Sequence, residues 1–157
     1  MPKAPVLDKV AVDLARGHTQ PAIQRLSSLV SAYPHDLDLR HRLAAVHRMT
    51  GNAVEAGRWD YLNPTAEPAE TGAFERAFPS APRRLAALRW QGSADLAPTE
   101  HARQRLLDLT EAARQDTPPV EVEPRWWRIT TVLLTGTAAV VVAALVVLGA
   151  VTVLQAF

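Results

Sequence analysis

The sequence contains no cysteine among its 157 residues. Disulfide bridges, thiolate nucleophiles and zinc–thiolate centres are therefore excluded. Charge imbalance is also absent, because the formal net charge is only +1. Non-specific binding of nucleic acid requires a basic surface. We accordingly expect no nucleic-acid partner.

Catalytic motifs are missing as well. The sequence has no Gly-x-Ser-x-Gly elbow, phosphate loop, dinucleotide fingerprint or kinase motif set. His41 and His47 are six residues apart, whereas zinc-binding histidines on one helix are typically four apart. We therefore expect no enzymatic activity, no cofactor and no metal ion. A carboxylate pair assembled in space stays open, because a sequence does not reveal one.

The chain has no charged side chain from Ile129 to Phe157. As a helix, the stretch 129–154 would rise ~39 Å, which exceeds the roughly 30 Å of a bilayer's hydrocarbon core. The basic and aromatic residues typical of a membrane interface precede it directly: Arg125, Trp126, Trp127 and Arg128. These features predict a single transmembrane helix, since buried core helices rarely run so long without a polar face.

The charges around this span predict its orientation. Basic residues stay on the cytoplasmic side, so we expect the amino-terminal domain in the cytoplasm and a tail anchor in the cell membrane. The first nine residues contain no apolar run, so no secretory signal is expected. Thr135, Ala139 and Ala143 form a row of small residues at four-residue spacing. Such a row suits a homo-oligomeric helix contact, and equally a lipid-exposed face.

The rest of the chain has the apolar spacing of helices. We predict an all-α domain over 1–114, a proline-rich acidic spacer over 115–124, and the interfacial collar with the transmembrane helix over 125–157. The predicted helices of the domain lie near 5–16, 20–32, 37–50, 53–61, 70–78, 82–90 and 98–115.

A repeat occurs in the first half of this domain. Gly17 and Ala22 recur as Gly51 and Ala56, at an offset of 34 residues. Each glycine is predicted to end a first helix, and each alanine to allow the second helix to pack closely against it. The pattern resembles tetratricopeptide helical hairpins over about residues 3–63.

The sequence departs from this repeat at three positions. Val10 stands where a small residue is usual, and Asp60 and Asn63 stand where apolar residues are usual. We therefore expect the second hairpin to be short or bent. Two hairpins do not bury a repeat core well, so the segment after Pro64 must extend the repeat or form a lid over it; the sequence leaves both open.

A second resemblance is carried by the stretches 56–62 (Ala-Gly-Arg-Trp-Asp-Tyr-Leu) and 75–79 (Glu-Arg-Ala-Phe-Pro). They are similar to a family of uncharacterised actinobacterial proteins known only as a domain of unknown function. The resemblance spans most of residues 5–114. It implies a helical, repeat-like fold and no particular activity.

The candidate partner groove consists of the basic residues of one predicted helix: Arg40, Arg42, His47 and Arg48. The tetratricopeptide resemblance implies that first helices line a concave groove, where basic side chains hold a peptide carboxylate or an acidic motif. The alternative is a solvated helix face whose arginine stems cover the core.

Two functions follow from these patterns. The first is a membrane-tethered adaptor that binds an unidentified protein partner through its helical domain, with membrane lipid around its anchor. The alternative is a membrane-active effector, or an oligomer-forming single-pass protein, in which the helical domain acts as a sensor or brake.

Overall fold

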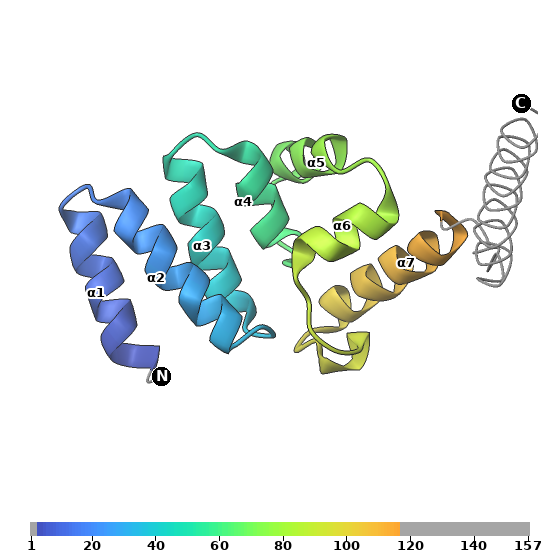
Figure 1. Ribbon diagram of the computed structural model, residues 1–157, viewed down its shortest axis with the longest axis horizontal. Helices are drawn as coiled ribbons and strands as arrows, with labels where there is room; N and C mark the ends of the chain where they lie inside the picture. Colours follow the sequence, from blue (N-terminus) through green and yellow to red (C-terminus); the bar gives the residue numbers. More distant parts are fainter. Residues whose placement is uncertain (1–2, 117–157) are drawn as a thin grey trace, which may run out of the picture. The chain divides into compact units, whose positions relative to one another are not determined.

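The computed structural model describes residues 3–116, which form helices joined by turns and loops (Figure 1). No strand occurs in this part of the chain. The all-α class and the seven predicted helices are confirmed, and the sequence pattern misses only the short 3₁₀ helix η1. The elements are α1 (Lys3–Ala15), α2 (Thr19–Ala32), α3 (Leu37–Met49), α4 (Ala53–Asp60), α5 (Pro68–Ala77), α6 (Ala81–Leu88), η1 (Ala94–Leu96) and α7 (Glu100–Asp116).

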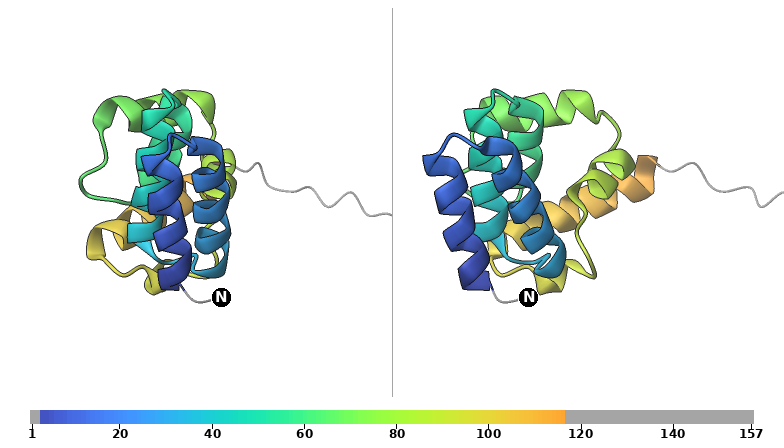
Figure 2. Two further views of the ribbon diagram at one scale, coloured as in Figure 1. Left: turned by 90° about the vertical axis from the view of Figure 1, so that its left-hand side faces the viewer. Right: turned by 60° about the vertical axis from the view of Figure 1, so that its left-hand side comes forward.

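The first four helices form two antiparallel hairpins that pack side by side in chain order (Figures 1 and 2). Gly17 and Gly51 end the first helix of each hairpin, and both have φ +74°. This left-handed conformation strains any residue with a side chain. The N–H groups of the next residues, His18 and Asn52, donate to the carbonyls of Asp13 and His47 at 2.8 and 2.9 Å. The two turns therefore have the same bonding at the predicted offset of 34 residues.

Polar side chains begin both helices of the second hairpin. Asp36 accepts a hydrogen bond from the Leu39 N–H at 3.1 Å, and Asn52 accepts one from the Glu55 N–H at 3.1 Å. Such caps satisfy backbone donors that have no partner inside the helix. They fix where α3 and α4 start relative to the preceding turns.

A first apolar cluster fills the space between α1, α2, α3 and α4. Ala22 is fully buried, as its predicted role in close packing requires. The second hairpin is shorter than the first, because α4 has 8 residues against 14 in α2. α4 ends at Asp60, one of the two polar departures from the repeat. The expected shortening of this hairpin is therefore confirmed.

The contact between α4 and α5 depends on Gly57. A Cβ atom at this position would overlap the backbone carbonyl of Glu70 in α5. Backbone carbonyls have no rotamer with which to yield, so only glycine permits this approach. The contact places α5 directly against α4 (Figure 1).

A second apolar cluster joins α5, α6 and α7 to the end of α4. Phe74 is fully buried in it and contacts the rings of Tyr61 and Phe78, each with centroids 5.2 Å apart. Trp59 belongs to the first cluster and Tyr61 to the second. Their spacing of two residues therefore sends the two rings into different cores.

Among residues 3–116, no helix is long and apolar enough to cross a bilayer. Gln115 and Asp116 end α7 rather than starting the predicted spacer. The remainder of that spacer lies outside the described residues. So do the predicted collar (Arg125, Trp126, Trp127 and Arg128) and the predicted transmembrane helix with Thr135, Ala139 and Ala143.

Substitution of Gly57 by alanine tests the α4–α5 contact. We expect Gly57→Ala to destabilise the protein by about 1–3 kcal/mol, because the added methyl group forces two backbones apart. The matched control is Gly72→Ala inside α5, where the new Cβ meets only the flexible Arg76 side chain at 3.2 Å. The control should be neutral, or stabilising by up to about 1 kcal/mol. Urea denaturation followed by circular dichroism measures both, and equal effects would contradict the assignment.

Candidate interaction site

The four basic residues predicted to line one groove do not share a surface. Arg40 is almost fully buried, with 1% of its surface exposed. Arg42 and Arg48 are exposed and His47 is half-buried. All four come from α3, yet they face different neighbours. Their individual contacts explain why.

Arg40 lies inside the domain rather than in a groove. Its Nε donates to the Pro34 carbonyl at 3.0 Å, and its Nη1 donates to the Leu88 carbonyl at 2.9 Å. The guanidinium also lies 5.6 and 5.4 Å from the ring centroids of Trp59 and Trp90. Burial, with a further contribution from the charge of Arg58, lowers the pKa of Arg40 to about 10. The residue stays charged at neutral pH and is inaccessible to a partner, which corrects its assignment to the groove.

Arg58 binds the carboxyl end of α6, where Leu88 also accepts the hydrogen bond from Arg40. Its Nε donates to the Ala87 carbonyl at 2.5 Å, and its guanidinium lies 4.5 Å from the Trp59 ring centroid. The last carbonyls of a helix have no partner within the helix and carry partial negative charge. Arg58 and Arg40 therefore cap the carboxyl end of α6 from α4 and α3. Arg89 follows the last residue of α6 and ends the helix in the left-handed conformation, with φ +49°.

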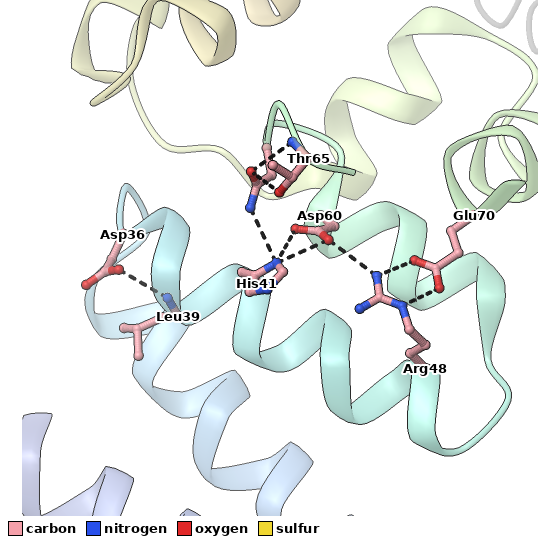
Figure 3. Close-up of polar contacts among 8 residues, drawn as sticks. Asp36, Leu39, His41, Arg48, Asp60, Thr65 and Glu70 are labelled. Carbon is pink, nitrogen blue, oxygen red and sulfur yellow. Dashed lines mark hydrogen bonds and ion pairs between the residues drawn. The ribbon is translucent and has the colours of Figure 1, made fainter. Parts of the chain in front are cut away.

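Arg48 is engaged by carboxylates from α4 and α5. Its Nε and Nη2 donate to the two carboxylate oxygens of Glu70 at 2.5 and 2.6 Å, and Nη2 also donates to Asp60 at 3.4 Å. Figure 3 shows this bidentate pair beside the contact of Asp60 with His41. Hydrogen bonding to Glu70 raises the pKa of Arg48. An acidic partner motif would have to displace this pair before it reached Arg48.

Arg42 and His47 are the two remaining residues of the predicted groove. Arg42 is paired with Asp38 one helical turn away at 2.9 Å, and both side chains are more than half exposed. Such pairs are weak, so Arg42 can exchange its partner. Burial lowers the pKa of His47, although the Glu55 carboxylate opposes the shift. Arg42 is thus the accessible cation among the four residues. Arg40 and Arg48 instead make contacts between helices of the domain.

An apolar groove between α1 and α3 is the surface feature that the sequence analysis missed. Its volume is about 190 Å³, and Arg42 contributes its one charged side chain. Met49, at the end of α3, is 65% exposed. The apolar spacing of α1 was a signal for the groove, but the pattern did not show that part of this face stays open. The lining residues are Leu7, Val10, Ala11, Leu14, Leu26, Arg42, Ala45, Val46 and Met49.

A larger hollow of about 410 Å³ lies between α6, α7 and the connecting loop. Trp90 lines it together with the partly exposed Leu107, while Asp95 and Arg114 add charges of both signs. The indole N–H of Trp90 donates to the Ser93 carbonyl at 3.1 Å, which holds the ring against its own loop. This hollow therefore mixes apolar and charged groups, unlike the α1–α3 groove. Within residues 3–116, no group of three or more potential metal ligands comes together.

Substitution of Arg40 tests its structural role. We expect Arg40→Met to lower the free energy of unfolding by about 2–3 kcal/mol, because buried carbonyls lose their donors. The control is Arg42→Met on the same helix. Arg42 has only an exposed pair with Asp38, so its loss should change stability by less than about 0.5 kcal/mol. Urea denaturation measures the difference, and a tolerated Arg40→Met would refute the assignment.

Comparison with known proteins places the chain in a family without assigning it an activity. No curated protein matches the chain significantly, and no solved structure does so. A family of unknown function, DUF6584, matches residues 1–155. The match covers the helical domain and nearly all of the residues after it. The chain therefore belongs to the DUF6584 family of unknown function.

Proposed function

We propose that this protein is a membrane-tethered protein–protein interaction adaptor without catalytic activity of its own. Its tetratricopeptide-like helical domain binds an apolar segment of a partner protein in the groove between α1 and α3. The observation that carries the proposal is this groove, whose lining is apolar except for Arg42. Apolar side chains of a partner that enter such a groove are removed from water, which favours binding.

The dimensions of the groove favour side chains of a protein partner over a small molecule. Its volume of about 190 Å³ is below the roughly 300–1,000 Å³ of ordinary small-molecule pockets. Met49 is 65% exposed at the end of α3, and methionine adapts its shape to different apolar partners. An amphipathic helix or an extended apolar segment fits these features.

The two hairpins support the tetratricopeptide-like part of the proposal. Their turns at Gly17 and Gly51 have the same φ and the same bonding. α1 and α3, which line the groove, are the first helices of the two hairpins. The partner would therefore lie along equivalent faces of successive repeat units.

Tethering completes the proposed function. The uncharged stretch 129–154 would anchor the chain as a single-pass protein of the cell membrane, with the helical domain in the cytoplasm. An anchored domain meets membrane-associated partners at a raised effective concentration. This would allow a groove of modest area to act at useful occupancy. The apolar groove on the helical domain favours the adaptor over an oligomer-forming effector, because it offers a surface for a partner on the domain itself.

Site-specific photocrosslinking from the groove tests partner binding. We expect a photoreactive amino acid at position 49 to form adducts with a protein partner in native membranes. The same group at Gln20, an exposed position of α2, should not form them. Ala45→Arg, which fills the groove, should abolish the adducts from position 49. Identical adducts from both positions, or adducts that survive Ala45→Arg, would contradict the proposed groove.

Alkaline extraction tests the anchor. We expect the full-length protein to stay in the membrane pellet, with its amino-terminal domain accessible only from the cytoplasmic side. Val141→Arg combined with Leu145→Arg should release it, because each arginine near a span centre costs about 2.5–3.5 kcal/mol. Release of the unmodified protein by alkali would refute the anchor and leave the groove proposal to its own test.

A further inference from the structure

His41 has an environment that neither the adaptor function nor the repeat requires. Its Nδ1 lies 3.0 and 3.3 Å from the two carboxylate oxygens of Asp60. The Asp60 side chain is 1% exposed, whereas the His41 side chain is 45% exposed. A buried carboxylate thus holds one ring nitrogen (Figure 3), while the imidazole side chain is partly exposed.

The contacts of Asp60 define which nitrogen of His41 carries the hydrogen. A carboxylate accepts hydrogen bonds and donates none, so Nδ1 must be the donor. The Asn63 amide N–H group lies 3.3 Å from Nδ1 and, being a donor, would need Nδ1 as an acceptor. The charged carboxylate at 3.0 Å is the closer and stronger partner, so Nδ1 donates to it. Arg48 pairs with Oδ2 of Asp60 at 3.4 Å and helps to keep the carboxylate in place. The lone pair of the imidazole is therefore on Nε2.

Nε2 is available for reaction. It makes no hydrogen bond within residues 3–116, and 45% of the side chain is exposed although Nδ1 lies against a carboxylate that is 1% exposed. A carboxylate on the opposite nitrogen fixes the tautomer and the orientation of an imidazole ring. His41 therefore presents an oriented nucleophile on the surface of α3.

The other histidines lack this arrangement. The Nε2 of His35 contacts the Gln91 carbonyl at 2.6 Å, and its ring packs against Trp90. His47 is half-buried. His18 and His101 are exposed, and neither has an ion pair among the described contacts. His18 and His101 therefore serve as exposed reference histidines with which the reactivity of His41 can be compared.

We propose that His41 is a phosphoryl-accepting site, modified at Nε2 by donors in which phosphorus is bonded to nitrogen or to a carboxylate oxygen. With phosphoramidate, the Nε2 lone pair attacks phosphorus and an Nε2–P bond forms. The P–N bond of the donor breaks, and its electron pair leaves with ammonia. The proton on Nδ1 stays in the hydrogen bond to Asp60, whose negative charge balances the positive charge that develops on the ring.

Labelling of the full-length protein with phosphoramidate tests this site. Peptide mapping at neutral to alkaline pH, which preserves N–P bonds, measures the rate at each of the five histidines. We expect His41 to react about 10–100-fold faster than His18 and His101. The scale is the loss of metal affinity or activity that follows removal of such a hydrogen-bond partner from a metal-binding histidine. In concentrated urea the preference should vanish, because it depends on the fold.

Two variants separate chemistry from folding. Asp60→Asn should reduce labelling at His41 to the rate of His18, while His35→Gln should leave it unchanged. If Asp60→Asn does not fold, the comparison of native with urea-treated protein decides. Equal native rates at His41, His18 and His101 would overturn the proposal. So would a preference that persists in urea, or fast labelling of a folded Asp60→Asn protein.

Discussion

The carboxyl end of α6 is the point on which the arrangement of the helical domain depends. Its last carbonyls accept hydrogen bonds from Arg58 of α4 and from the buried Arg40 of α3. Trp59 lies against both guanidinium groups. Unpaired buried carbonyls and an unpaired buried cation would each be strongly unfavourable. Because each satisfies the other, two apolar clusters that have no side chain in common are held in one domain.

The position of α3 between the two apolar clusters explains where the surface features lie. α3 contributes to both the interior and the exterior: Arg40 faces α6, His41 faces Asp60, and Arg42 borders the apolar groove. Successive residues of a helix point in different directions, so three adjacent positions serve three separate contacts. A helix with five buried residues can therefore still border a groove and leave an imidazole partly exposed.

Much of the fold could be predicted because its signals are local. The glycines at 17 and 51 and the cap at Asp36 specify helix ends within a few residues of themselves, and the short α4 follows from the polar residue Asp60. The burial of Arg40 could not be predicted in this way. Its partner Leu88 is 48 residues away, and a run of basic residues has the same pattern whether it is solvated or buried. The open groove likewise depends on how α1 and α3 meet, which no short motif encodes.

Hydrogen exchange of the native full-length protein tests most directly whether the α6 cap couples the two clusters. In the unmodified protein, the slowest amides of α2 and α7 should exchange with the same free energy of opening, because both clusters open together. In Arg40→Met, the amides of α7 should lose more protection than those of α2, because the two clusters then open separately. Equal loss of protection in both helices, or none in either, would contradict a central role for the Arg40 contact.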